Sequence, residues 1–271
     1  MDSLQQTDQW PVDHASSAVI ARDGRVLGTH GDVDRVYPLA SVTKLLTAYA
    51  MLVALEEGAF ELDDPAGPDG ATIRHLLAHT SGLDFDTDEV RAAPGDRRIY
   101  SNTGFAVLAR TLTEQSGLAF ADYLHEAVLA PLAMRSTTLT GSPGAGAHSN
   151  VADLIRFAAE LQHPSLIHPS TLDSATTVEF PGRDGVLPGF GRQRPNDWGL
   201  GLELRDGKDP HWTGASSSPE TFGHFGQSGT FLWVDPRAEA ACVVLTDRDF
   251  GQWAADAWPA LTDAILAELR G

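Results

Sequence analysis

Three short motifs contain the side chains that could do covalent chemistry. The first, Ser41-Val42-Thr43-Lys44, begins a strongly apolar segment. A serine at a helix N-terminus faces the positive end of the helix dipole, which favours an alkoxide and a developing oxyanion. Lys44 lies one turn later on the same face, so its amine can reach the Ser41 hydroxyl, and burial would lower its pKa enough for it to act as a base. By itself the motif also fits a helix cap followed by a solvated lysine.

The second motif is Tyr100-Ser101-Asn102, where a loop meets a predicted helix. Tyrosine can act as a base where a cation lowers its pKa, and Lys44 could supply that charge. Asn102 offers both a donor and an acceptor for a substrate amide or carbonyl. Helix capping by Ser101 or Asn102 explains the same residues without any catalytic role.

The third motif runs from Gly223 to Gly229 as Gly-His-Phe-Gly-Gln-Ser-Gly and leads into a predicted strand. Glycines on an edge strand let a substrate approach the backbone closely, and the N–H of Gln227 could bond a carbonyl oxygen. A glycine-rich turn with a surface histidine is the structural alternative. The three motifs in this order favour nucleophilic catalysis more strongly than any one of them alone.

The elements around the motifs predict strands at both ends of the chain. A hairpin is expected because Asp23-Gly24, a strong turn signal, separates apolar segments 15–22 and 25–29. Further strands are predicted at 198–204, 230–234 and 238–245. Helices are predicted at 41–57, 71–79, 102–116, 119–130, 150–162 and 252–269. This order excludes simple βαβ alternation and indicates one antiparallel sheet shared by both terminal segments.

Composition excludes several kinds of function. The 271 residues carry 19 basic and 37 acidic side chains, a formal net charge of −18, and no dense basic run. Nucleic acid and membrane surfaces are therefore not expected as partners, and small molecules or proteins are. The first residues lack the pattern of a signal peptide, and no stretch is apolar enough to span a membrane, so a cytoplasmic location is expected.

Metal and cofactor chemistry have little support in the sequence. The single cysteine, Cys242, lies in an apolar run and can form neither an intramolecular disulfide nor a thiolate zinc site. His75 and His79 are four residues apart, but no third metal ligand is evident. We expect no metal and no cofactor. Phe225 and Trp212 could line an apolar acyl pocket.

The pattern Ser41-x-x-Lys44, Tyr100-x-Asn102, His224-x-Gly226 resembles that of the serine penicillin-recognising superfamily. The tyrosine of the second motif points to the class C branch, which holds class C β-lactamases, D-alanyl-D-alanine carboxypeptidases and related carboxylesterases. The phrases at 76–83 and 198–201 also look like that branch. The resemblance extends from about residue 12 to 268.

The resemblance implies an α/β fold of the α+β type, with an antiparallel sheet flanked by terminal helices. Segments 1–58 and 170–271 would form the α/β domain, and 59–169 a mostly helical insert. The active site would lie in the cleft between them.

The resemblance also implies a role for each motif residue. Ser41 would be the acylated nucleophile, Lys44 its activating partner, and Tyr100 the base that also protonates the leaving group. Asn102 would bind substrate, and the N–H groups of Ser41 and Gln227 would form the oxyanion hole. His224, followed by Gly226, replaces the lysine that β-lactamases carry in the third motif.

The histidine in the third motif favours esterase chemistry, because a mostly neutral imidazole is a poor counter-charge for a β-lactam carboxylate. The leading prediction is a serine hydrolase that cleaves carboxylic esters, with some amides as further candidate substrates. A β-lactamase or D-alanyl-D-alanine carboxypeptidase is the alternative, with Arg192 or Arg194 of a predicted loop at 180–195 helping to hold the carboxylate. A noncatalytic binding module is a further alternative. The natural acyl group and the oligomeric state are left open.

Overall fold

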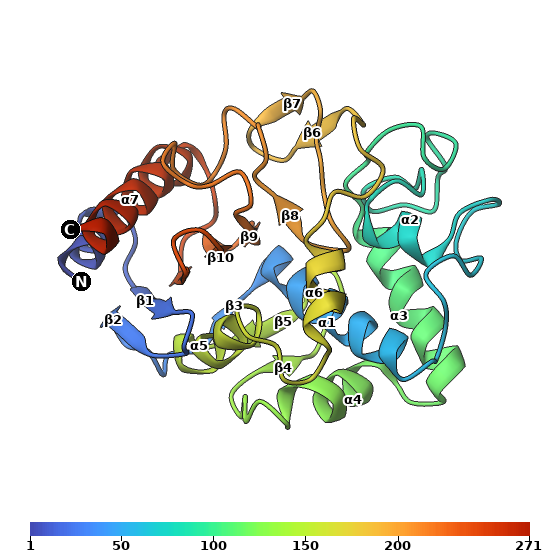
Figure 1. The fold of residues 1–271 in the computed structure, drawn as a ribbon, viewed down its shortest axis with the longest axis horizontal. Helices are drawn as coiled ribbons and strands as arrows, with labels where there is room; N and C mark the ends of the chain where they lie inside the picture. Colours follow the sequence, from blue (N-terminus) through green and yellow to red (C-terminus); the bar gives the residue numbers. More distant parts are fainter.

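The main element of the fold is a six-stranded antiparallel sheet in the computed structural model, which describes all of residues 1–271 (Figure 1). The strand order is β2-β1-β11-β10-β9-β8. The bounds are Ala15–Ala21 for β1, Val26–His30 for β2, Glu203–Leu204 for β8, Phe222–Gly226 for β9, Thr230–Asp235 for β10 and Ala240–Thr246 for β11. Because β1 pairs with β11 along its whole length, the prediction that the terminal segments share one sheet is confirmed.

The two faces of the sheet bury different side chains, since successive residues of a strand point to opposite sides. Val19 and its partner Cys242 pack with the apolar face of α7 (Gln252–Arg270). Their neighbours Ile20 and Val243 face the larger core, to which α5 (Val151–Glu160) belongs. The sheet is therefore covered on both sides, and Cys242 is a core residue as predicted.

The central helix of the larger core is α1, Thr43–Glu56. Its residues from Thr43 to Ala54 are all buried, which explains why the segment is apolar on every side. The helix predicted at 41–57 begins two residues later than expected, because a short 3₁₀ turn, η2 (Ala40–Val42), precedes it. Ser41 lies in that turn and not in α1 itself.

The remaining helices gather at the end of the molecule away from α7 (Figure 1). They are α2 (Ile73–Leu77), α3 (Asn102–Ser116), α4 (Phe120–Leu124) and α6 (Pro169–Ala175). The bounds predicted for α3 are confirmed. The helix predicted at 119–130 divides into α4 and a π-helical turn, η3 (His125–Leu129). Neither α6 nor the N-terminal 3₁₀ helix η1 (Asp2–Gln9) is predicted from the sequence.

The strand predicted at 198–204 is wrong over most of its length. Only Glu203 and Leu204 form a strand; Trp198 makes isolated bridges to Glu179 and Glu203, and the chain bends at Leu200 and Gly201 against α1. Gly201 has a φ of 77°, and a Cβ there would lie 2.4 Å from the Cβ of Ala48. Glycine is therefore required because α1 and this bend approach so closely.

The segment predicted as a long loop at 180–195 contains a small hairpin of β6 (Gly185–Leu187) and β7 (Gly191–Gln193). A second small sheet joins β3 (Tyr37–Pro38), β5 (Ala147–Ser149) and β4 (Thr138–Leu139). None of the helices combines the length and the apolar character that crossing a membrane requires.

The division into an α/β part and a helical insert at 59–169 stays a prediction. Helices α2, α3 and α4 do lie within this range. However, α5, which also lies within it, packs against β1 and β11 of the main sheet.

Candidate active site

The nucleophile predicted from the first motif is held by a strained turn. Ala40, the residue before Ser41, has a φ of 44°, in the left-handed region that alanine rarely adopts. Such strain persists only where the surrounding structure enforces it, and it is concentrated at functional sites. Here the turn is pinned because the N–H of Leu39 bonds the carbonyl of Ala147 and the Leu39 carbonyl accepts the hydroxyl of Thr230.

Lys44 is fully buried, and its ammonium group reaches three acceptors. Its Nζ lies 3.4 Å from Oγ of Ser41, 2.8 Å from the carbonyl oxygen of Gly144 and 2.5 Å from Oδ1 of Asn102. Burial lowers the pKa of Lys44 to about 7, against a smaller opposing effect of the Asp86 carboxylate. The predicted lowering of this pKa is confirmed. A neutral amine can donate to Asn102 and Gly144 while its lone pair faces Ser41.

Tyr100 and His224 form a hydrogen-bonded pair beside Ser41. The phenolic oxygen of Tyr100 lies 3.3 Å from Nε2 of His224, and Nδ1 of His224 lies 2.6 Å from the carbonyl oxygen of Phe225. A carbonyl can only accept, so Nδ1 carries the proton and Nε2 accepts the proton of Tyr100. Burial, together with the charge of Lys44, lowers the pKa of His224 to about 3. His224 is therefore neutral near pH 7, as expected from the sequence for an imidazole in the place of the β-lactamase lysine.

The expectation that a nearby cation lowers the pKa of Tyr100 is wrong for the unliganded site. Lys44 Nζ does lie 4.7 Å from the centre of the Tyr100 ring. Nevertheless burial raises the pKa of Tyr100, and a hydrogen bond with Ser41 opposes this only in part. Tyr100 is thus a neutral phenol before substrate binds, able to pass a proton on rather than to act alone as a base.

Two backbone N–H groups stand free at the position expected for an oxyanion hole. Neither the N–H of Ser41 nor that of Gln227 donates to any acceptor in the structure. Gln227 is held in place because its carbonyl accepts from the N–H of Phe250 at 2.7 Å and its side chain donates to the Phe250 carbonyl at 3.2 Å. Free, preorganised N–H groups are what a tetrahedral intermediate requires.

Gly226 explains why these two N–H groups come together. A Cβ at Gly226 would lie 2.3 Å from the carbonyl oxygen of Leu39 and 2.6 Å from the hydroxyl of Thr230. The absence of a side chain thus lets β9 lie directly against η2, the turn that carries Ser41.

Asn102 has a partner that the sequence analysis missed. Its Nδ2 donates to the carboxylate of Asp86 at 2.8 Å, which turns its Oδ1 toward Lys44. Ser101, not Asn102, caps α3, since its hydroxyl accepts the N–H of Gly104. Asp86 stands in an acidic surface loop, and nothing in its sequence context distinguishes it from its neighbours.

His79 contacts the second motif through a hydrogen bond and through ring packing. Its Nδ1 accepts the N–H of Ser101 at 3.2 Å, and its ring packs against those of Tyr100 and Trp198. Burial holds its pKa well below the ordinary value, so the ring is neutral. These contacts give His79 a structural role in the site.

A small cavity of about 80 Å³ is lined by Ser41, Tyr100, His224, Gln227, Phe225 and Glu203, among others. It brings together residues of all three motifs. Phe225 contributes to its wall, as predicted for an acyl pocket. Trp212 does not line this cavity; it is buried and donates from Nε1 to Glu203 at 2.9 Å.

Glu203 is the second residue that the sequence analysis missed. It is buried and accepts from Lys208, from Nε2 of His211 at 3.0 Å and from Trp212. Burial alone would raise the pKa of Glu203, but Lys208 and His211 lower it to about 2. The anchored carboxylate closes one side of the small cavity.

Arg192 and Arg194, suggested as helpers in carboxylate recognition, are exposed on the β6–β7 hairpin and its continuation. Both pair with Asp184, at 3.2 and 3.4 Å. The structure brings Ser41, Lys44, Tyr100, Asn102, His224, Gly226 and Gln227 together, and leaves Arg194 outside that group.

A serine beside a buried lysine, a tyrosine and two free N–H groups, set between an antiparallel sheet and a helical core, is the arrangement expected of a serine hydrolase of the penicillin-recognising type. The chain belongs to the Beta-lactamase family, whose model matches residues 14–266. It is thus a member of the superfamily of serine β-lactamases and penicillin-binding proteins, as the motifs implied.

Solved structures agree with this assignment. A β-lactamase (Mb2281c) from Mycobacterium bovis is 58% identical, with a TM-score of 0.97, and the match covers 98% of this chain and 99% of that one. EstCE1, a hydrolase with promiscuous acyltransferase activity, shares the fold at 19% identity, with a TM-score of 0.81 and coverage of 98% and 97%.

Curated relatives match over shorter stretches. The D-alanyl-D-alanine-carboxypeptidase/endopeptidase AmpH of Escherichia coli is 29% identical over 175 residues, which is 46% of this chain and 46% of AmpH. Penicillin-binding protein 4* of Bacillus subtilis is 29% identical over 135 residues, 38% of this chain and 30% of that protein. The matched region thus spans less than half the length of either relative.

Proposed function

We propose that this protein hydrolyses small carboxylic esters through an acyl intermediate on Ser41. The observation that carries the proposal is the fully buried Lys44, whose pKa of about 7 leaves a large neutral fraction at physiological pH within reach of the Ser41 hydroxyl. The free N–H groups of Ser41 and Gln227 lie at the same small cavity.

The neutral state of His224 supports an ester rather than a β-lactam as substrate. Its pKa of about 3 leaves it uncharged at neutral pH, and its Nε2 is occupied by Tyr100. A β-lactam carboxylate would therefore meet no positive charge at the third motif. An ester carbonyl needs only the nucleophile and the oxyanion hole.

In acylation, Lys44 takes the Ser41 proton as Oγ forms its bond to the ester carbonyl carbon. The carbonyl oxygen becomes an oxyanion held by the N–H groups of Ser41 and Gln227. Lys44 is a better proton acceptor than His224, because pKa values of about 7 and 3 differ by roughly 5 kcal/mol of proton affinity.

When the intermediate collapses, the carbon–oxygen bond to the alcohol breaks and the leaving oxygen needs a proton. Tyr100 is placed to give its own proton and to regain one from the protonated Lys44 beside its ring. A water molecule then takes the place of the alcohol, and the same groups run the sequence in reverse to release the acid and restore Ser41.

Intact-protein mass spectrometry of the wild type and Ser41→Ala, after mixing with p-nitrophenyl acetate or with a penicillin, tests this proposal. Absorbance of nitrophenol release is followed in parallel. We expect ester turnover in the wild type only, a transient acetyl adduct lost in Ser41→Ala, and no lasting penicillin adduct. Circular dichroism of Ser41→Ala checks that the fold is kept.

The other outcomes assign the other activities. Rapid Ser41-dependent loss of the penicillin would indicate a β-lactamase. A persistent adduct would indicate a penicillin-sensitive peptidase, the activity named for AmpH. Ester turnover that survives in Ser41→Ala would remove Ser41 as the nucleophile, and no reaction with any of these compounds would favour a binding module.

A further inference from the structure

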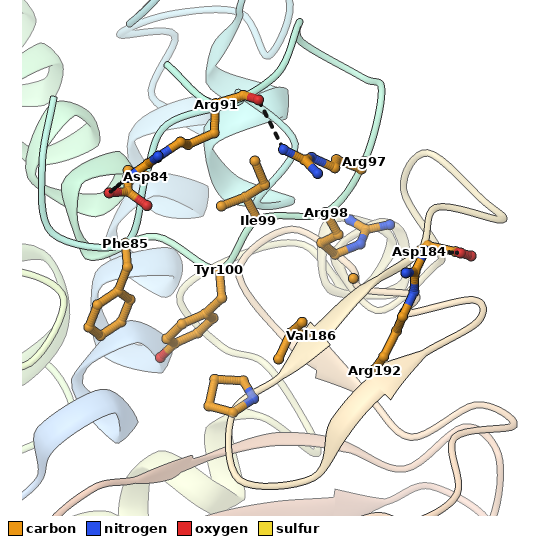
Figure 2. A pocket seen from close by; sticks show the side chains of 12 residues that line it. Asp84, Phe85, Arg91, Arg97, Arg98, Ile99, Tyr100, Asp184, Val186 and Arg192 are labelled. Atoms are coloured by element: carbon orange, nitrogen blue, oxygen red, sulfur yellow. Dashed lines mark hydrogen bonds and ion pairs between the residues drawn. The ribbon is translucent and has the colours of Figure 1, made fainter. Parts of the chain in front are cut away.

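A second, much larger cavity adjoins the small catalytic one. It has a volume of about 600 Å³ and shares three lining residues, Phe85, Tyr100 and Pro188, with the catalytic cavity. Figure 2 shows that one wall comes from the loop before α3 and the opposite wall from the β6–β7 hairpin. The catalytic cavity holds only about 80 Å³, and the neighbouring cavity offers room for the rest of a larger substrate.

Part of the wall of the larger cavity is apolar and exposed to water. Phe85 and Val186 are 46% and 58% exposed, and both line it. Ile99 and Pro188 add further apolar surface. A substrate with an aromatic or aliphatic body would remove this surface from water.

Cationic side chains surround this apolar surface: four arginines and two aspartates line the cavity. Two of the arginines have carboxylate partners: Arg91 pairs with Asp84 at 3.3 Å, and Arg192 pairs at 3.2 Å with Asp184, which it shares with Arg194. The chain as a whole carries a net charge of −18, so a cavity with more arginines than carboxylates in its lining differs in charge from the rest of the protein.

The other two arginines differ from each other. Arg98 is buried and donates to backbone carbonyls, among them those of Glu179 and Phe180. Arg97 is exposed; its one hydrogen bond goes to the backbone carbonyl of Arg91 at 2.9 Å, and it has no ion-pair partner. Figure 2 shows its guanidinium extending from the loop toward Arg91. Arg98 also lies 3.8 Å from the carboxylate of Asp197, so Arg97 is the one lining arginine without a carboxylate partner.

We propose that the larger cavity binds the alcohol portion of an ester that has an apolar body and carries one carboxylate, which pairs with Arg97. The alcohol side is chosen because Tyr100, which gives the leaving oxygen its proton, is shared by both cavities. The choice of side rests on the proposed function. A carboxylate fits because a planar guanidinium binds it through two parallel hydrogen bonds, and one unpaired cation matches one negative charge.

Two esters that differ only in charge test this proposal: m-carboxyphenyl acetate and its neutral analogue, m-carbamoylphenyl acetate. The quantity compared is the ratio of kcat/KM for the charged ester to that for the neutral one. We expect Arg97→Gln to lower this ratio about fivefold, mainly through KM, since an exposed charge pair contributes up to about that much. Arg97→Glu lowers the ratio further by repelling the carboxylate.

Arg110→Gln is the matched control, because Arg110 is also an exposed arginine without an ion-pair partner and does not line the cavity. It leaves the ratio unchanged. An unchanged ratio in both Arg97 variants would overturn the proposal, as would an equal drop in Arg97→Gln and Arg110→Gln.

A binding measurement separates failure of this inference from failure of the proposed esterase. Ser41→Ala is titrated by calorimetry with m-acetamidobenzoate and with its neutral amide, m-acetamidobenzamide. We expect tighter binding of the carboxylate, lost when Arg97→Gln is added. If the protein binds the carboxylate more tightly than the amide but turns over no ester, the esterase proposal is refuted and the anion site is kept. If the protein turns over esters but binds the two compounds equally, only the anion site is refuted.

Discussion

Nε2 of His224 accepts the phenolic proton of Tyr100, because its Nδ1 proton is already given to the carbonyl of Phe225. This single orientation leaves the lone pairs of the Tyr100 oxygen for Ser41, whose hydrogen bond opposes the rise in the tyrosine's pKa. The histidine of the third motif thus has the tyrosine of the second motif as its hydrogen-bond partner.

Removal of the phenol tests this arrangement. We expect Tyr100→Phe to lower kcat for p-nitrophenyl acetate by about 10²- to 10⁴-fold, the usual contribution of a positioned proton donor. Stopped-flow measurements will show both the acylation burst and the steady state slowed. Tyr123→Phe is the control, since the Tyr123 hydroxyl bonds Glu57 away from the site. A burst of normal rate in Tyr100→Phe would assign acylation to Lys44 alone.

Activity is expected to depend on the protonation of Lys44. Only the neutral amine has a lone pair for the Ser41 proton, so kcat/KM falls about tenfold per pH unit as the pH drops below about 7. The pH dependence of kcat/KM with a neutral ester measures this limb. A limb centred near the ordinary lysine pKa of 10.5 would mean that Lys44 keeps its proton throughout.

Asp86 is expected to set the pH at which this fall in kcat/KM occurs, through its effect on the pKa of Lys44. Burial lowers the pKa of Lys44, and the Asp86 carboxylate raises it in part. Asp86→Asn keeps an acceptor for Asn102 but removes the charge, so the acid limb of kcat/KM is expected to move to lower pH. Asp88→Asn, in the same exposed loop, leaves the limb where it is. Equal profiles for the two variants would show that the Asp86 charge does not reach the lysine.

Glu203 is expected to matter for stability. Glu203→Gln leaves the buried Lys208 without its counter-charge, which costs about 3 to 5 kcal/mol of unfolding free energy when a buried pair loses one partner. Urea unfolding measures the loss. Glu220→Gln is the control, because the Glu220–Arg237 pair is exposed and contributes at most about 1 kcal/mol.

The same carboxylate sets a pH window for stability. In the folded chain the pKa of Glu203 is lowered from 4.5 to about 2, so the unfolded chain binds its proton more readily. This stabilisation is present above pH 4.5 and is lost as the pH falls toward 2. Glu203→Gln therefore shows a flatter decline of unfolding free energy over that range, and a decline equal to that of the wild type would assign the acid sensitivity to other groups.

Gly226→Ala tests the oxyanion hole. The new Cβ would meet the carbonyl of Leu39, which separates β9 from η2 and moves the N–H of Gln227 away from that of Ser41. Losing one oxyanion donor lowers kcat by about 10²- to 10³-fold. Gly207→Ala, where a Cβ meets nothing within 4 Å, is the control. Normal turnover in a folded Gly226→Ala protein would exclude Gln227 from the oxyanion hole.

The sequence predicts best what depends on local signals. Asp23-Gly24 predicts the β1–β2 hairpin, and the apolar run after Ser41 predicts α1, because turn geometry and helical periodicity involve near neighbours. The residues of the candidate site can also be predicted, because they lie in three short motifs. Each motif can be recognised from the types and the spacing of a few neighbouring residues.

The features missed from the sequence depend on partners far along the chain. Trp198 to Gly201 resembles a strand, but Gly201 fits against Ala48 of α1 and the segment turns there. Asp86 gains its role only through Asn102, and Tyr100 has a raised pKa because of burial that no local pattern reveals.

The pairing of β1 with β11 also has a consequence for the order of assembly. It joins Ala15 to Thr246, and the small cavity brings Ser41 beside Gln227, so both depend on contacts that close very long loops. Contacts of such high sequence separation slow folding, whereas helices such as α3 form from near neighbours. In refolding from urea, recovery of helical circular dichroism should therefore precede recovery of ester turnover, and enzymatic activity would report completion of the sheet.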